Sequence, residues 1–150
     1  MKPVFQEIID EGTGDCFSAC LASILELPIG EVPKFRRDHG REMMKAARKW
    51  CAENFGLSII TIQMEDLDDE ELEGKDIRLI GAVEKTPCIA GGKSPNLENC
   101  SHAVVGELDR HGMNFDITHD PNPSGKGIVG RPTHLYFLVP MKPENFIMKK

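Results

Sequence analysis

The sequence predicts an α+β fold, in which N-terminal helices are followed by an antiparallel sheet. Two segments with apolar residues at helical spacing precede residue 55, and strand-like segments rich in Val, Ile and Thr follow residue 56. Helices and strands that occur in separate runs favour this class over a doubly wound one, in which they alternate. The 150 residues fit one compact domain, 1–150, because no repeat and no long linker divides the chain.

The first helix is expected to begin near Cys16. The run Thr13-Gly14-Asp15 supplies a turn and an N-cap, and apolar residues then recur at helical spacing as far as Leu27. Pro28 ends this helix, since proline cannot continue the backbone hydrogen-bond ladder.

A second helix is predicted over residues 41–54, with Gly56 as its C-terminal stop. Its apolar stripe, which we interpret as core packing, consists of Met43, Met44, Ala47, Trp50 and Cys51. Residues 57–63 then predict a strand. Residues 65–76 hold eight acidic side chains and one lysine, a pattern typical of a solvated surface segment.

The C-terminal half predicts the sheet. Four candidate strands follow, over residues 77–83, 102–108, 113–119 and 134–139, and residues 84–101 between the first two predict a loop with two prolines and Gly91-Gly92.

Composition restricts the function classes. The net charge of −6 argues against a nucleic-acid binder, because phosphate contacts need clustered Lys and Arg. A local group of Lys34, Arg36, Arg37 and Arg41 is better explained as a solvated surface. No apolar run is long enough to cross a membrane, and no signal peptide is visible, so a cytosolic protein is expected. Five cysteines at irregular spacing predict free thiols, not a disulfide framework.

Cys16 is the cysteine whose position predicts chemistry. A thiol is a strong nucleophile only when ionised, and its ordinary pKa is about 8.5. At the first turn of a helix, the helix dipole and the unpaired backbone N–H groups favour the thiolate. Cys20 and Cys51 fit small core hydrophobes instead, and the sequence does not rank Cys88 and Cys100.

A nucleophilic cysteine needs a base, and His102 at the start of a predicted strand is the candidate. A three-residue hairpin loop over residues 110–112 would place His102 directly opposite Asp120, close enough for the carboxylate to hold the imidazole. A loop of two or four residues would instead turn Asp120 to the other face and bring His119 toward His102. Asp116, in mid-strand, is the rival carboxylate.

A resemblance to the papain-like cysteine peptidases enters here. It rests on residues 14–25, Gly14-Asp15-Cys16-Phe17-Ser18-Ala19-Cys20-Leu21-Ala22-Ser23-Ile24-Leu25, which resemble the nucleophile helix of that superfamily. They are similar in particular to the bacteriocin-processing (double-glycine) peptidases and to small phage and bacterial proteins with the pattern G-[DN]-C-F-x-A-C-x-A-S-[IL]-L. Residues 27–35, 101–106 and 119–127 continue the likeness, and the blocks follow the family order Cys, His, Asp.

The resemblance implies a papain-like fold with N-terminal helices packed on an antiparallel sheet. It also implies that Cys16 is the nucleophile, His102 the general base, Asp120 the orienting carboxylate and Gln6 the side-chain donor of the oxyanion hole. The gap from Gln6 to Cys16 is longer than in the double-glycine peptidases. The expected activity is that of a peptidase, isopeptidase or amidase that forms a thioester with a protein or peptide substrate, in a bacterial or phage-infected cytosol. It requires no cofactor and no metal.

Two alternatives remain open at this point. Cys16, Cys20, Cys100 and His102 would together supply three thiolates and one imidazole for a zinc ion. The chain would otherwise be a non-enzymatic interaction module of a phage or bacterium on the same scaffold.

Overall fold

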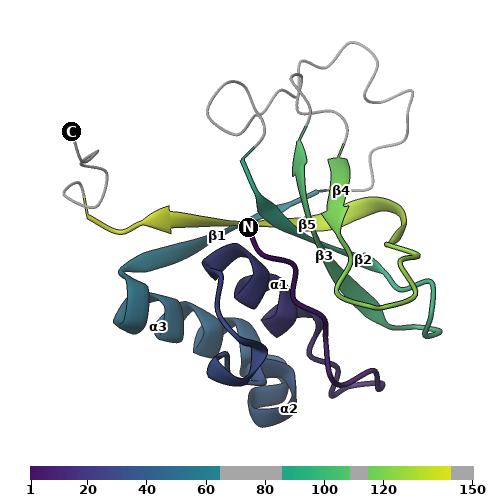
Figure 1. Cartoon of the computed structure of the whole chain (residues 1–150), viewed down its shortest axis with the longest axis horizontal. Helices are drawn as coiled ribbons and strands as arrows, with labels where there is room; N and C mark the ends of the chain where they lie inside the picture. Colours follow the sequence, from purple (N-terminus) through teal and green to yellow (C-terminus); the bar gives the residue numbers. More distant parts are fainter. Residues whose placement is uncertain (65–85, 109–114, 143–150) are drawn as a thin grey trace.

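The computed structural model describes residues 1–64, 86–108 and 115–142, in which helices pack on one antiparallel sheet (Figure 1). The α-helices are α1 (Cys16–Leu25), α2 (Phe35–His39) and α3 (Met43–Phe55), with 3₁₀ turns at Ile29–Glu31 and Gly40–Glu42. The strands are β1 (Leu57–Gln63), β2 (Cys88–Lys93), β3 (Ser101–Leu108), β4 (Phe115–His119) and β5 (Val129–Pro140). Their order is β1-β5-β2-β3-β4, and every neighbouring pair is antiparallel. The predicted α+β class is confirmed.

The two predicted helices are present close to their expected bounds. α1 begins at Cys16 and ends before Pro28. α3 ends at Phe55, and its C-cap Gly56 has a φ of 63°, the left-handed conformation that suits glycine. The short helix α2 was not predicted. It lies beside the start of α3, where the buried ring of Phe35 packs edge-on against Trp50 with ring centroids 5.8 Å apart.

The strand prediction is correct for β1, β3 and β4 and wrong for residues 84–101, which contain β2. Gly91 and Gly92 led to the loop prediction, because glycine is disfavoured in strands. Their missing side chains leave room for neighbours: Tyr136 packs over Gly91 and Ile128 packs over Gly92. β5 is also longer than the predicted 134–139. The predicted strand 77–83 and the whole acidic segment 65–76 fall in residues 65–85, outside the described part of the chain.

The sheet buries apolar side chains on both faces. Ile89 of β2 and Ala103 and Val105 of β3 join the cluster beneath α1 and α3, whereas their neighbours Ala90 and Val104 belong to a second cluster. This alternation follows from the two-residue period of a strand. The first cluster also holds Cys20 and Cys51, which are fully buried as predicted. It fixes α1, and with it Cys16, against the sheet.

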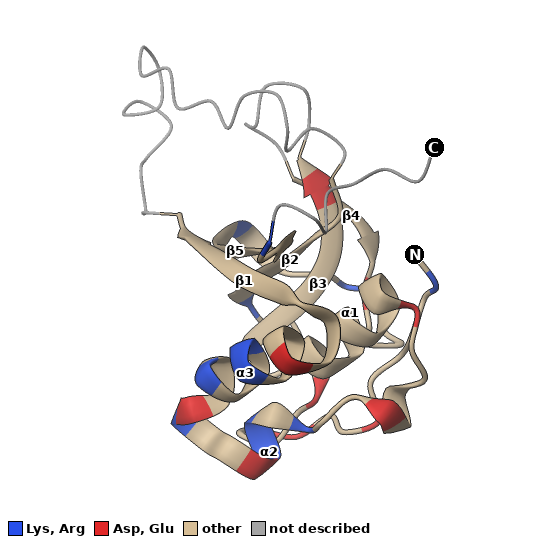
Figure 2. Cartoon of the chain, turned by 90° about the vertical axis from the view of Figure 1, so that its left-hand side faces the viewer, with Lys and Arg blue, Asp and Glu red and all other residues tan. Residues whose placement is uncertain are grey.

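Basic residues outnumber acidic ones on the helices. α2 carries Arg36 and Arg37 with Asp38, and α3 carries Lys45, Arg48 and Lys49 with Glu53 (Figure 2). Within the described ranges, no single helix is long and apolar enough to cross a membrane. The segments Cys16–Leu25 and Ile29–Phe55 would have the necessary length and apolar composition only if taken together, and a bend of 106° separates them.

Candidate active site

One cleft of about 380 Å³ brings together residues from distant parts of the sequence. Cys16, the first residue of α1, lines it together with Gln6 from the N-terminal segment and His102 from β3. Cys16 is half-buried, so its thiol is accessible from the cleft but shielded from bulk water.

His102 and Asp120 form a buried pair beside this cleft. His102 Nε2 lies 2.7 Å from Asp120 Oδ1, and the two side chains are 5% and 6% exposed. The carboxylate engages Nε2, so Nδ1 is the ring nitrogen that remains to exchange a proton with a thiol. The backbone N–H of Ala103, the next residue after His102, lies close enough to the Cys16 thiol to lower its pKa. Cysteine and histidine are therefore neighbours in the cleft wall.

The turn that follows β4 holds the Asp120 carboxylate from behind. Oδ1 also accepts the N–H of Asn122 at 2.9 Å, and Oδ2 accepts the N–H of Gly127 at 2.7 Å. Gly127 has a φ of 68°, and a Cβ there would meet the Ile117 side chain, so the position requires glycine. The Asp120 carboxylate thus contacts one imidazole and accepts hydrogen bonds from two backbone N–H groups. These three contacts fix it in one orientation.

The predicted strand register is wrong by one residue near the turn and by two beyond a bulge, yet His102 and Asp120 still meet. Near the turn, Leu108 faces Phe115 and Glu107 faces Asp116, whereas the prediction placed Phe115 opposite Glu107. A bulge between Val105 and Gly106 then shifts the pairing by one, so that Val105 faces His119. If this register continues past His119, Asp120 lies opposite Val104. Asp120 is then on the same face of the sheet as His102 and is its diagonal neighbour. The hairpin loop itself lies in residues 109–114, outside the described residues.

The rival residues lie elsewhere. His119 is buried, and its Nε2 is 2.7 Å from the carbonyl oxygen of Val4, so it anchors the N-terminal segment and does not face His102. Asp116 is exposed on β4 opposite Glu107.

Burial raises the pKa of the Cys16 thiol above its ordinary value. The N–H groups of Ala103, Phe17 and Cys16 lower this pKa, as expected at a helix start, and the carboxylate of Asp15 raises it. The net direction is upward. The N–H groups at the helix start favour the thiolate as expected, but burial outweighs them.

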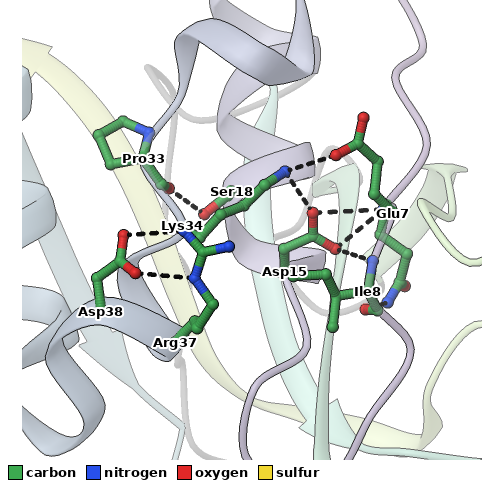
Figure 3. A network of polar contacts seen from close by, with 9 residues as sticks. Glu7, Ile8, Asp15, Ser18, Pro33, Lys34, Arg37 and Asp38 are labelled. Carbon is green, nitrogen blue, oxygen red and sulfur yellow. Dashed lines mark hydrogen bonds and ion pairs between the residues drawn. The ribbon is translucent and has the colours of Figure 1, made fainter.

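Asp15 has a role that the sequence did not predict. It occupies the N-cap position of α1 but makes no side-chain cap hydrogen bond. Its fully buried carboxylate instead accepts the N–H groups of Glu7, at 3.0 Å, and Ile8, at 2.9 Å, and pairs with Lys34 Nζ at 2.6 Å (Figure 3). Lys34 also lies 3.3 Å from a Glu7 oxygen. Lys34 was expected on a solvated surface; it is largely buried because it neutralises Asp15.

This network places Gln6 in the cleft wall. The Gln6 N–H donates to the carbonyl oxygen of Pro121 at 3.0 Å, next to Asp120, while the two following N–H groups reach Asp15, next to Cys16. The Gln6 side chain is buried, and its Nε2 donates to the Ile8 carbonyl oxygen at 2.8 Å. Its expected role as an oxyanion donor therefore stays a prediction, since the donor group points to the main chain in this structure.

The zinc alternative finds little support in the geometry. Cys20 is enclosed in the core, and His102 Nε2 is engaged by Asp120. Across the described ranges, no group of three or more His, Cys, Asp or Glu side chains is arranged to hold a metal ion. Cys100 does line the cleft, and its thiol is free, as are the other four.

Sequence reasoning missed part of the cleft. His134 and Tyr136 of β5 line it and stack with ring planes 12° apart. Their spacing of two residues on a predicted strand was the signal that puts both side chains on one face. Asn96 lies in the loop between β2 and β3, and no sequence pattern pointed to it.

The chain was compared with family models, with curated proteins and with solved structures, and none of the three comparisons gives a match. Inference about function therefore rests on the geometry of the cleft.

Proposed function

We propose that the chain is a cysteine-dependent hydrolase with a papain-like fold, in which Cys16 is the nucleophile, His102 the general base and Asp120 the orienting carboxylate. The observation that carries the proposal is the buried 2.7 Å contact between His102 and Asp120 beside the cleft that Cys16 lines. A nucleophile, a base and a group that orients the base are the three parts that thiol acyl transfer requires. The sequence blocks that resemble papain-like peptidases contain all three residues.

The reaction proceeds in two halves. His102 Nδ1 takes the thiol proton as the Cys16 sulfur attacks the acyl carbon, and Asp120 stabilises the resulting imidazolium. The tetrahedral intermediate collapses to a thioester when the leaving group departs with the proton that His102 returns. Water, deprotonated by His102, then attacks the thioester, releases the carboxylic acid and restores the thiol.

The raised pKa of the Cys16 thiol determines how the base works. Burial disfavours the charged sulfur and so raises the pKa of the Cys16 thiol. Proton transfer to His102 is therefore coupled to the attack. The backbone N–H of Cys16 donates a hydrogen bond to the oxyanion. It is one of the N–H groups at the start of α1 that have no partner within the helix.

The substrate is a protein or peptide, and the bond cleaved is a peptide, isopeptide or other amide. A cytosolic site of action in a bacterium or a phage-infected cell is supported by the five free thiols, which are typical of a reducing compartment. The papain-like assignment of the fold is supported by a nucleophile on the first residue of a helix that packs on the strand carrying the base.

The activity is tested with a fluorogenic library of peptide amides of randomised sequence. Wild-type protein is expected to cleave a subset, and an acid-quenched sample is expected to carry the acyl group on Cys16 by mass spectrometry. Cys16→Ala should lose both signals, whereas Cys100→Ala, which removes another thiol of the same cleft, should keep them. Cleavage that persists in Cys16→Ala would contradict the proposal. A binding module would instead retain its cellular effect in Cys16→Ala.

A further inference from the structure

Two buried polar atoms in the cleft lack partners. Among residues 1–64, 86–108 and 115–142, Gln6 Oε1 and Asn96 Nδ2 are the buried side-chain polar atoms without a hydrogen bond. Both residues line the cleft that holds Cys16 and His102. A buried polar atom without a partner is costly, and a native protein retains it where a ligand or water completes it.

Gln6 offers an acceptor. Its Nε2 donates to the Ile8 carbonyl oxygen at 2.8 Å, and the reverse orientation of the amide would set two oxygen atoms against each other. The unpartnered atom is therefore the oxygen. Gln6 is only 9% exposed, and its main chain is held by Pro121 on one side and through Asp15 on the other. The acceptor is fixed in the wall before any ligand arrives.

Asn96 offers a donor. Its own N–H and that of Leu97 donate to Ser94 Oγ at 3.2 and 3.1 Å, and the Ser94 N–H donates to the Cys100 carbonyl oxygen at 2.9 Å. These bonds hold the loop between β2 and β3 in one conformation. The Nδ2 of Asn96 is thus a buried donor on a rigid support.

We propose that Gln6 and Asn96 recognise amide groups of the substrate, with Gln6 Oε1 accepting an amide N–H and Asn96 Nδ2 donating to an amide carbonyl oxygen. An unpartnered acceptor and an unpartnered donor in one cleft match the two polar groups of a peptide unit. An ester or thioester has the carbonyl oxygen but no N–H, so it leaves Gln6 Oε1 unpaired. The assignment rests on the proposed function, because it concerns the cleft of Cys16, and it selects an amide-containing peptide over an ester as the substrate class.

The test uses N-acetyl-glycyl-glycine chloromethyl ketone, which alkylates a thiol with loss of chloride and needs no side-chain preference. Two ester counterparts each replace one amide N–H by oxygen. The second-order rate of Cys16 alkylation is measured by mass spectrometry for all three and divided by the rate with glutathione. At least one ester is expected to react about tenfold more slowly than the all-amide probe.

Variants assign this preference to the two side chains. Gln6→Met, of similar volume, should abolish the preference for amide over ester, whereas Gln63→Met, at an exposed glutamine of β1, should retain it. Asn96→Leu should slow all three probes by about tenfold and leave their ratios unchanged. Circular dichroism verifies that each variant is folded.

The outcomes separate the two proposals. Equal rates for amide and ester probes in the wild type, with Cys16 still the alkylated residue, overturn the amide assignment and leave the hydrolase proposal intact. A preference that survives in folded Gln6→Met overturns it as well. Failure of Cys16 to react with any probe or with iodoacetamide contradicts the hydrolase proposal itself.

Discussion

At the scale of single residues, Asp120 connects the catalytic base to the backbone. Its two oxygens form hydrogen bonds with the His102 imidazole and with the backbone N–H groups of Asn122 and Gly127. Each of these N···O distances is 2.9 Å or less. The side chain is almost fully buried, so water does not replace a lost partner. His102 is held in one orientation because Asp120 is itself held.

Asp120→Asn is expected to slow Cys16 alkylation by iodoacetamide at pH 7 by about tenfold or more. The asparagine has one acceptor oxygen, so its NH₂ group would face one of the backbone or imidazole donors. Rates are measured by mass spectrometry, and thermal unfolding reports the accompanying loss of stability. Asp116→Asn, at the exposed carboxylate of β4, is the matched control and should leave the rate unchanged. Equal rates in the two variants would contradict the role given to Asp120.

The buried thiols predict a loss of stability at alkaline pH. Burial raises the pKa of Cys51 to about 11 and that of Cys88 to about 12, well above the ordinary value for a thiol. Between pH 9 and 11 the unfolded chain loses these protons and the folded chain keeps them, so the free energy of unfolding falls as pH rises. Each thiol contributes up to about 1.4 kcal/mol per pH unit.

Urea unfolding between pH 8 and 11 measures this slope. Cys51→Ala should reduce the slope of the unfolding free energy against pH by the contribution of one thiol, although the variant is less stable at every pH. Ile59→Val, which also removes volume from the same core cluster but no ionisable group, should keep the wild-type slope. A Cys51→Ala slope equal to that of the wild type would rule out the raised pKa.

At the scale of elements, the N-terminal segment is part of the site. Residues 6–8 have no regular secondary structure, yet they are tied to Pro121 beyond β4 and to Asp15 at the start of α1. Lys34, in the connection before α2, supplies the charge that makes the buried Asp15 carboxylate tolerable. Three segments far apart in sequence thereby support one wall of the cleft.

Lys34→Met is expected to lower the free energy of unfolding by about 3–5 kcal/mol, because it leaves the Asp15 carboxylate buried without a countercharge. Urea unfolding at pH 7 measures the change. Lys34→Arg should recover part of the loss. Lys49→Met, which removes an exposed ion pair with Glu53, should have little effect. A stability of Lys34→Met within the error of the wild type would show that the Asp15–Lys34 pair is not structural.

Gly106→Ala is expected to separate β3 from β4 and to slow Cys16 alkylation. A Cβ at position 106 would overlap the Asp116 carbonyl oxygen and the Phe115 ring. This glycine adjoins the bulge that brings Asp120 to the face of His102, so a displaced β4 moves the carboxylate. The expected cost in stability is about 1–3 kcal/mol. Gly30→Ala, where a Cβ meets no atom within 4 Å, is the control. Wild-type stability in Gly106→Ala would contradict this account of the bulge.

At the scale of the whole molecule, the sequence predicted what local patterns encode. Helix α1 and strand β1 follow from apolar periodicity and flanking Pro and Gly, and both lie near their expected bounds. The approach of Asp120 to His102 was anticipated from strand pairing, but through a register that lacked the bulge. A bulge depends on packing between strands, and so it leaves little trace in the sequence of either strand.

The features that the sequence did not reveal depend on tertiary contacts. Strand β2 was taken for a loop because Gly91-Gly92 is typical of turns, and only the packing of Tyr136 and Ile128 over it favours a strand. The pairing of Lys34 with Asp15 joins residues 19 positions apart and has no local signature. The N–H groups at the helix start lower the pKa of Cys16 as expected, but the burial that outweighs them arises from tertiary packing.

The most direct test of the central claim is the rate of Cys16 alkylation by iodoacetamide from pH 5 to 11, in wild type and in His102→Ala. In the wild type, Cys16 should be alkylated at neutral pH because His102 accepts the thiol proton. The alkylation rate should rise again at alkaline pH. In His102→Ala only the alkaline rise should remain, with its midpoint above that of an ordinary thiol because burial raises the pKa of Cys16. His39→Ala, at an exposed histidine of α2, should follow the wild type. A His102→Ala profile that matches the wild type at neutral pH would contradict the assignment of His102 as the base of Cys16.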